Sequence, residues 1–356
     1  MMGAAQYAKA LQEPESCSLQ KALGKHDYKK VSTLSEFIVE RSELADLLIT
    51  LLYCASHGGR VLLAFPNREV RCGSRSFFDQ SEDKPDLALL QLVLAKMPAV
   101  ADMAEHARRS EGALEVYLET IDTLLFPLLQ WLVEPHFACR ILQEDEKPEG
   151  VTCDWIVSVQ PHPADKETRF QEIKAASQKG SRFGFHGSCT GNFHSILRQG
   201  IKIMSGTEYQ TTGTSYGRGV YMGSHSSISQ SYCTKNKATN WPLSKFAAAG
   251  PLIIMALVEL VDDPANVKTH ACSSTNTGGT QIFVAEDEEI FVTRFLFINP
   301  SSEICTTKLL EPCLRIIEFH QSALLSQPAD IKNNNASSSA SLSSEGSCNE
   351  DTESDF

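Results

Sequence analysis

The chain has 356 residues, of which 42% are hydrophobic and 21% charged, a composition typical of soluble globular proteins. This length exceeds one ordinary domain and suits two, with residues left over for unstructured segments. The net charge of −12 disfavours nucleic acid as a partner, because binding to phosphates needs surplus Lys and Arg.

A polar N-terminal extension is expected to precede the first helix. Residues 1–34 show no strong hydrophobic period, and we expect them to be weakly structured. From Ser35, which we take as the N-cap, apolar residues recur at helical spacing until Ser56-His57-Gly58-Gly59 ends the helix. Residues 60–66 form a short apolar crossing after it.

Two further apolar blocks complete a helical domain. One begins at Asp86, directly after a proline, and the other covers residues 113–133. Pro127 lies inside the second block and is expected to kink or divide it. We therefore expect a largely helical domain over residues 35–135, in which the leucine stripes serve core packing.

The second half of the chain changes to short strands. Strands are expected at residues 152–160, at residues ending near 186, and at residues 251–261, 281–284 and 290–298. The last two read as a β-hairpin or strand pair joined by the acidic turn at residues 286–289. This pattern predicts an α+β domain over residues 150–320. The Ser-, Asn- and acid-rich residues 327–356 are expected to be disordered.

The cysteines and the remaining apolar segments bear on compartment and metal content. The eleven cysteines are scattered, and none forms the C-x-x-C pair of a zinc site or redox motif. Free, unclustered thiols suit a reducing compartment. Neither a signal-peptide pattern nor about 18 consecutive apolar residues occur. We therefore expect a cytoplasmic or nuclear protein with no membrane span and no bound metal.

Four segments carry residue types that suit the binding of a planar amide and a sugar. They are FGFHGS at 183–188 with NFHSILRQGI at 192–201, YGRGVYM at 216–222, SSISQSY at 226–232, and the strand pair at 281–297. Gly187 has no side chain, so its backbone N–H and C=O can both approach a ligand amide. Ser229 and Tyr232 lie three apart on an expected helical turn, so a hydroxyl and a ring face one side. Each segment alone is more often structural, but their order and spacing together are far more specific.

Together these segments resemble the catalytic domain of the poly(ADP-ribose) polymerase-like ADP-ribosyltransferases. Within that family the sequence most resembles the mono-ADP-ribosylating pair often called PARP six and PARP eight. The tail-anchored member called PARP sixteen shares FHGS and NFHSI but matches less well at SSIS and TRFLF. The likeness includes FPLLQWLV at 126–133 and ETRF at 167–170, and it covers roughly residues 85–300. It implies a split antiparallel β-sheet of the ADP-ribosyltransferase type after the helical domain, with NAD as co-substrate.

The resemblance implies a role for each matching residue. His186 matches the histidine that hydrogen-bonds the adenosine ribose, and Ser188 is expected to assist there. Gly187 matches the glycine whose backbone holds the nicotinamide carboxamide. Ser229 matches the hydroxyl that also binds this amide, and Tyr232 matches the ring that stacks on nicotinamide.

The chain departs from the family at the third position of the His-Tyr-Glu triad. His186 and Tyr221 match the first two positions. Aligning TRFLF at 293–297 with the family's last strand puts the glutamate at Ile282, or at Gln281 if the register slips by one. Isoleucine can neither bind a ribose hydroxyl nor act as a base, and glutamine can only hydrogen-bond. We therefore expect single ADP-ribose transfer and no elongation to a polymer.

Two functions stay open. Glu286, Glu288 and Glu289 are candidates to replace the missing acid, although a solvated acidic turn accounts for them better. The leading hypothesis is an NAD-dependent protein mono-ADP-ribosyltransferase that modifies acceptor proteins, the chain itself among them. The alternative is a catalytically inactive module of the same fold that binds NAD or ADP-ribose and signals to a partner through the helical domain.

Overall fold

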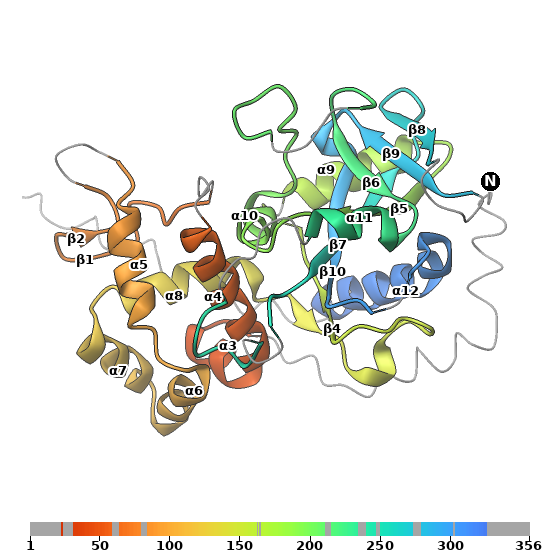
Figure 1. Cartoon of the computed structure of the whole chain (residues 1–356). Helices are drawn as coiled ribbons and strands as arrows, with labels where there is room; N and C mark the ends of the chain where they lie inside the picture. The colour runs from red at the N-terminus through yellow and green to blue at the C-terminus, as the bar shows by residue number, and fades with distance from the viewer. Residues whose placement is uncertain are drawn as a thin grey trace, which may run out of the picture.

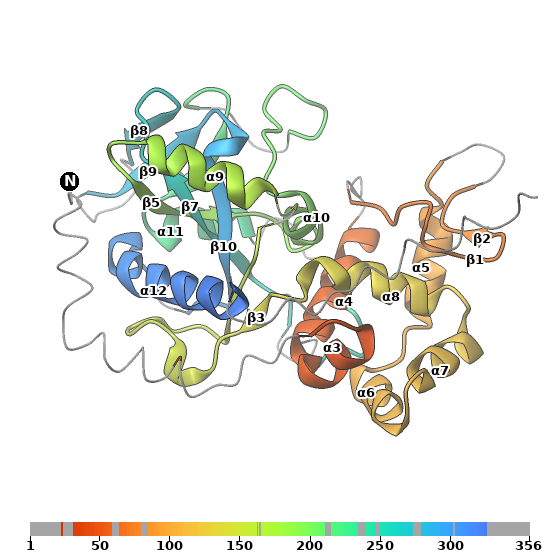
Figure 2. The ribbon, with the colours of Figure 1, turned by 180° about the vertical axis from the view of Figure 1, so that it is seen from behind.

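The computed structural model describes residue 23 and residues 31–58, 64–79, 84–161, 163, 165–210, 215–233, 240–246, 250–272, 279–301 and 303–325. Within these residues a helical region comes first, and an antiparallel β-sheet with helices on both faces follows. Figures 1 and 2 show the two regions side by side. The predicted α+β class is therefore confirmed. The predicted tail, almost all of the predicted extension and most of the apolar crossing at 60–66 lie outside the described residues.

In its described part, the helical region contains six α-helices and one short pair of strands. The helices are α3 (Leu34–Glu40), α4 (Ser42–His57), α5 (Leu87–Ala95), α6 (Val100–Arg109), α7 (Ala113–Ile121) and α8 (Leu125–Val133), and the strands are β1 (Arg71–Cys72) and β2 (Arg75–Ser76). Leucines from α4, α5, α7 and α8 are buried in one hydrophobic core, as predicted, but Leu87 and Leu92 of α5 are exposed. Helix α6 was not predicted, because its charged residues leave only a narrow apolar stripe.

The first helix begins at a capping box, whose N-cap lies two residues before the predicted one. The N-cap is Thr33 and not Ser35, since Thr33 Oγ1 accepts a hydrogen bond from the Glu36 backbone N–H at 3.2 Å. The Glu36 carboxylate accepts from the Thr33 N–H at 3.2 Å in return. This reciprocal arrangement satisfies two N–H groups that the first helical turn leaves free.

The apolar block at 113–133 is divided, but the break lies at Asp122 and not at Pro127. Asp122 is buried and extended, and its carboxylate accepts from the Leu124 N–H at 3.1 Å and from Lys96 Nζ at 2.8 Å. Pro127 is the third residue of α8, where a missing N–H removes no helical hydrogen bond. The cap therefore breaks the helix, and the proline is accommodated.

The described strands of the second region form one eight-stranded sheet. They are β3 (Arg140–Ile141), β4 (Trp155–Ser158), β5 (Ser181–Gly187), β6 (Val220–Gly223), β7 (Ile254–Val261), β8 (Val267–Ala271), β9 (Gln281–Ala285) and β10 (Phe291–Ile298). Their order is β3-β4-β10-β7-β5-β6-β9-β8, and each neighbouring pair is antiparallel. Strands β5 and β6 pair only at Phe185 and Gly223, so the sheet is split between them.

The predicted hairpin at 281–298 is wrong. Strand β9 pairs with β6 and β8 in the smaller half of the sheet, whereas β10 pairs with β4 and β7 in the larger half. The chain crosses from one half to the other through residues 286–290, which end in the 3-10 turn Glu288–Ile290. Adjacency in sequence suggested pairing, but the two strands occupy different halves of the split sheet.

Helices cover both faces of the larger half. Alternate residues of β10 belong to two separate cores, Leu296 and Ile298 to one and Phe295 and Phe297 to the other. The first core includes side chains from α9 (Asp165–Ala176) and α10 (Asn192–Gln199), and the second from α11 (Ser226–Cys233) and α12 (Thr306–Leu325). In Figure 2, α9 and α12 flank β10.

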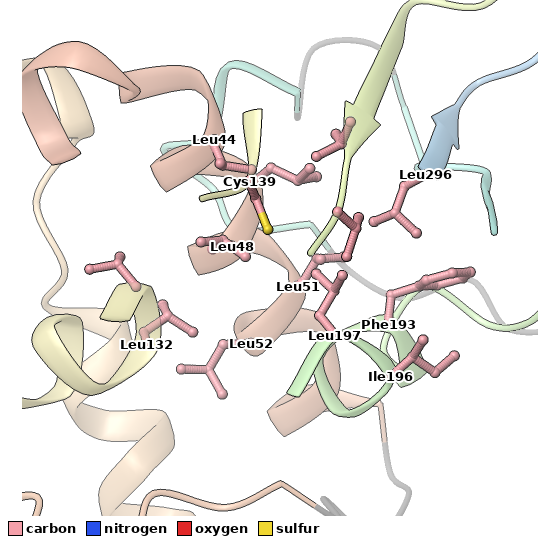
Figure 3. Packing of buried hydrophobic residues seen from close by; sticks show 14 of the residues in the cluster. Leu44, Leu48, Leu51, Leu52, Leu132, Cys139, Phe193, Ile196, Leu197 and Leu296 are labelled. Carbon is pink, nitrogen blue, oxygen red and sulfur yellow. The ribbon is translucent and has the colours of Figure 1, made fainter. Parts of the chain in front are cut away.

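The helical region packs directly against α10, which follows the His-Gly-Ser segment in sequence. Figure 3 shows leucines of α4 lying close to Phe193, Ile196 and Leu197 of α10. A Cβ on Gly191, just before α10, would lie 3.0 Å from Cys54 O and 3.2 Å from Ala55 Cα, so a larger residue would need this contact to open by a few tenths of an ångström. The start of α10 is thereby fixed against α4.

Two polar contacts reinforce this junction. Arg198 Nη1 donates to Trp131 O at 2.8 Å, and its guanidinium lies 3.7 Å from the centroid of the Trp131 ring. The buried Asp46 of α4 accepts from Ser244 Oγ and, at 3.1 Å, from the Lys245 N–H. The helical region therefore holds both the helix after β5 and the segment before β7.

Among the described residues, no helix is by itself long and apolar enough to cross a membrane, although α5 and α6 together meet those criteria across a 73° bend. Every cysteine in this part of the chain is a free thiol. No three of its His, Cys, Asp or Glu side chains are placed to hold a metal ion.

Candidate active site

His186 lies at the end of β5, beside the split in the sheet. Its Nδ1 is 3.0 Å from Tyr221 O in β6. A carbonyl can only accept, so Nδ1 carries a proton and Nε2 of the neutral ring is left as an acceptor. Burial lowers the pKa of His186, and the hydrogen bond to Tyr221 O opposes this only in part. The imidazole is therefore neutral at physiological pH.

Gly187 is in contact with the backbone of helix α11. A Cβ at this position would lie 2.0 Å from Ser229 O and 3.1 Å from Cys233 Sγ. No side chain can fit there, so strand and helix meet through their main chains. Sequence reasoning assigned the space at Gly187 to a ligand amide, whereas in this structure the backbone of α11 lies there.

Ser229 and Tyr232 both belong to α11, on the helical turn that was predicted for them. Ser229 is buried, and its Oγ donates to Phe185 O at 2.7 Å. With its proton directed at this carbonyl, the oxygen keeps lone pairs that can accept from another N–H. Tyr232 follows three residues later, and its side chain is 37% exposed. A hydroxyl and an accessible ring thus lie on neighbouring positions of one helix.

Ser188 and Tyr221 each hold local structure. Ser188 Oγ accepts a hydrogen bond at 2.8 Å from Nδ2 of Asn192, which is the first residue of α10. Tyr221 Oη accepts from the Tyr216 N–H at 2.9 Å and donates to Gly217 O at 2.8 Å. The Tyr221 hydroxyl is therefore committed to the glycine-containing turn before β6.

Strand register separates Ile282 from Gln281. Ile282 pairs with Gly223, two residues after Tyr221, so Ile282 and Tyr221 project from the same face of the smaller half-sheet. Gln281 is exposed and lies on the opposite face by alternation. Ile282 thus lies beside the strand that carries Tyr221, and the position offers no polar atom.

The acidic crossing is not a freely solvated turn, contrary to the sequence interpretation. The Glu288 carboxylate accepts from the Ile203 N–H at 2.7 Å and from Lys202 Nζ at 2.9 Å, and Glu286 pairs with Lys268. Burial would raise the pKa of Glu288, but these partners more than offset it and the pKa is lowered. These two carboxylates thus hold the crossing to neighbouring segments.

Two serines that the sequence analysis did not assign fix the framework. Ser224 extends the β6–β9 pairing, since its N–H donates to Gln281 O at 2.9 Å and its Oγ accepts from the Gln281 N–H at 2.8 Å. Ser226 Oγ accepts from the Ile304 N–H at 2.8 Å, which ties the start of α11 to the segment before α12. In the sequence, Ser224 lies between two motif segments and Ser226 opens the segment at 226–232, and neither pattern indicates a role for the serine.

Comparison with known proteins identifies the region that carries this geometry. Residues 140–295 match the family model for the poly(ADP-ribose) polymerase catalytic domain. This match begins at β3 and ends within β10, so it spans all eight strands of the sheet.

Curated relatives agree with that match. The chain is 30% identical over 146 residues to protein mono-ADP-ribosyltransferase PARP8 from Mus musculus and equally to that from Homo sapiens. Each alignment covers 41% of the chain but only 17% of the relative. Poly [ADP-ribose] polymerase 1 from Xenopus laevis is 30% identical over 108 residues, which is 26% of the chain and 11% of that protein. The chain therefore matches only a small part of each relative.

Fold, site geometry and family match agree with the resemblance found in the sequence. The eight-stranded split sheet of this protein, with its flanking helices, is the region that matches the catalytic domain of the poly(ADP-ribose) polymerase family.

Proposed function

We propose that this protein is an NAD-dependent protein mono-ADP-ribosyltransferase that transfers one ADP-ribose to acceptor proteins and releases nicotinamide. The observation that carries the proposal is the convergence of His186, Gly187, Tyr221 and Ser229 at the split between β5 and β6. The family match and the relatives named mono-ADP-ribosyltransferase support the reaction class.

The proposed nicotinamide subsite consists of Gly187, Ser229 and Tyr232. The Gly187 backbone N–H and C=O are a donor and an acceptor of the kind that a carboxamide requires. Ser229 Oγ, which donates to Phe185 O, can accept from the carboxamide N–H₂ with its lone pairs. The accessible Tyr232 ring supplies a stacking surface for the planar pyridine ring. These groups are all neutral and suit an uncharged amide on an aromatic ring.

The proposed contact to the adenosine ribose is His186. As a neutral imidazole with Nδ1–H held by Tyr221 O, it offers Nε2 as an acceptor for a sugar hydroxyl. The contact orients the ligand without adding positive charge.

In the reaction, the bond between ribose C1′ and the nicotinamide nitrogen breaks, and its electron pair neutralises the pyridinium. The acceptor oxygen forms the new bond to C1′ and loses its proton, if it has one, to solvent. The protein's share is to hold nicotinamide and ribose in fixed orientation, so that binding energy appears in the transition state. Ile282 offers neither a base nor an anion, which favours a single transfer over elongation. An acceptor carboxylate would itself supply the negative charge that this position lacks.

The alternative, an inactive module that binds NAD or ADP-ribose, keeps one observation in its favour. The aliphatic Ile282 stands on the Tyr221 face, where the family's glutamate is expected. Binding without turnover would follow if orientation alone did not lower the barrier enough.

The proposal is tested by measuring NAD affinity calorimetrically and transfer from labelled NAD in parallel, with and without lysate proteins as acceptors. Wild type is expected to bind NAD and to label protein, and His186→Ala to lose both. His57→Ala, a change at an exposed histidine of the helical region, serves as the control. Binding without labelling would select the inactive module, and absence of binding would reject both functions.

A further inference from the structure

His270 lies in the edge strand β8, in register with the position that lacks the triad acid. It pairs with Ile282 of β9, which pairs in turn with Gly223 of β6. Directly paired residues of antiparallel strands project to the same face. His270 and Ile282 are therefore on the face that carries Tyr221.

The ring of His270 belongs to an aromatic group that includes Tyr221. It stacks on Tyr216, with ring centroids 4.2 Å apart and planes at 22°. The centroids of the Tyr216 and Tyr221 rings lie 6.4 Å apart, and the backbone N–H of Tyr216 donates a hydrogen bond to Tyr221 Oη. The turn before β6 thus links the imidazole to a proposed catalytic residue.

One nitrogen of this imidazole has an unmet hydrogen-bonding capacity. Among the described residues, His270 Nε2 is buried and has no hydrogen-bond partner. Leaving a buried polar group unpaired is costly, and such groups in native structures call for an explanation. The neighbouring Ile282 cannot help, because its side chain is aliphatic. A hydroxyl fits this nitrogen in either tautomer, since it can donate or accept.

We propose that His270 Nε2 binds a ribose hydroxyl of NAD, and that it supplies the hydrogen bond which Ile282 cannot. This inference rests on the proposed NAD site. The imidazole positions the sugar and removes no proton from it. His270 in the edge strand β8 would then partly replace the glutamate that the family is expected to carry at position 282 in the neighbouring strand β9.

Two substitutions separate hydrogen bonding from packing. His270→Phe keeps a ring to stack on Tyr216 but removes both nitrogens, whereas His270→Gln loses the ring and keeps an amide near the place of Nε2. Loss of one neutral hydrogen bond is expected to weaken NAD binding roughly three- to tenfold in His270→Phe. His270→Gln is expected to stay within about twofold of wild type, because the amide can still bond a hydroxyl. NAD affinity by calorimetry and KM for NAD by labelling give the two readouts.

The matched control is His106→Phe. His106 of α6 also stacks on a tyrosine, Tyr117, at 3.7 Å and 3°, but within the helical region. It is expected to leave NAD affinity unchanged. Wild-type affinity in His270→Phe together with weak binding in His270→Gln would overturn the inference and assign His270 to packing.

The two proposals fail in distinguishable ways. If wild type binds NAD without transferring ADP-ribose, the transferase proposal fails, and the affinities of the two His270 variants still decide the inference. If wild type binds no NAD, both are overturned.

Discussion

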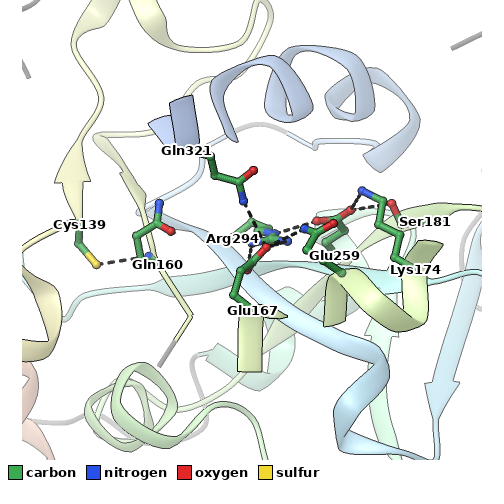
Figure 4. Close-up of polar contacts among 9 residues, drawn as sticks. Cys139, Gln160, Glu167, Lys174, Ser181, Glu259, Arg294 and Gln321 are labelled. Carbon is green, nitrogen blue, oxygen red and sulfur yellow. Dashed lines mark hydrogen bonds and ion pairs between the residues drawn. The ribbon is translucent and has the colours of Figure 1, made fainter. Parts of the chain in front are cut away.

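Arg294→Met is expected to destabilise the domain strongly, because it removes the centre of a buried ion network. Arg294 is 2% exposed, and its Nε donates to the Glu259 carboxylate, 1% exposed, at 2.7 Å. Its Nη2 donates to Glu167 of α9 at 3.0 Å. Figure 4 shows the guanidinium between the two acids. Because of a β-bulge between Thr293 and Phe295 of β10, Arg294 has no paired residue in β7.

The magnitude follows from what Glu259 keeps after the change. Removing one partner of a buried ion pair costs about 3–5 kcal/mol, since the other charge stays desolvated. Glu259 retains Lys174 Nζ at 2.7 Å and Ser181 Oγ at 2.6 Å. We therefore expect the free energy of unfolding to fall by about 3 kcal/mol, at the lower end of that range.

The effect should depend on pH in a defined direction. Burial would raise the pKa of Glu259, but Arg294 and Lys174 more than offset it, so the pKa is lowered in the folded protein. A lowered carboxyl pKa stabilises the fold above the unfolded value of about 4.3, and this contribution is lost as pH falls through the folded pKa. The gap between wild type and Arg294→Met is therefore expected to be full at pH 7 and to shrink below about pH 4.3.

Urea unfolding followed by tryptophan fluorescence at pH 7 and at lower pH measures both quantities. Arg169→Met on α9 is the control, because Arg169 is 57% exposed and its ion pair with Asp165 is worth at most about 0.5 kcal/mol. Arg294→Met combined with Glu259→Gln is expected to recover more than half of the loss. A cost below about 1 kcal/mol for Arg294→Met, or one independent of pH, would refute the reasoning.

Three further predictions follow from single contacts. Gly187→Ala is expected to push α11 from β5 and to weaken NAD binding at least tenfold by calorimetry; unchanged affinity would show that the backbone contact is not needed. Tyr221→Phe frees the turn before β6, and trypsin is expected to cut after Arg218 about five- to tenfold faster; an unchanged rate would argue against the hydroxyl as anchor. Arg198→Met removes a carbonyl hydrogen bond and a ring contact at Trp131. It is expected to lower the free energy of unfolding in urea by about 2 kcal/mol, and a change near zero would show that this contact does not stabilise the protein.

Much of the fold was readable because the relevant signals are local. The helix stop at His57, the helix start at Asp86 and the strand after Gly250 depend on neighbours in sequence, and the structure confirms them. The strand ending at Gly187 and the helical turn with Ser229 and Tyr232 were likewise predicted from local patterns. Local propensity thus located most of the segments that carry the site.

The errors came from interactions between distant segments. The hairpin prediction for β9 and β10 failed because pairing partners are chosen by the whole sheet, and the two strands lie in different halves. Arg294 in an apolar strand gave no sign of the bulge that directs it toward Glu167. The row from Gly223 through Ile282 to His270 depends on strand register, which short strands do not reveal in sequence.

The central claim, single transfer of ADP-ribose through this site, is tested most directly by mass spectrometry of the intact protein and of its modified peptides after incubation with NAD. Wild type, with an acceptor lysate or alone, is expected to yield adducts of one ADP-ribose at each modified residue, and His186→Ala and Tyr221→Ala to yield none. Chains of ADP-ribose on one residue would contradict single transfer. Adducts that persist in both variants would show that the chemistry occurs elsewhere.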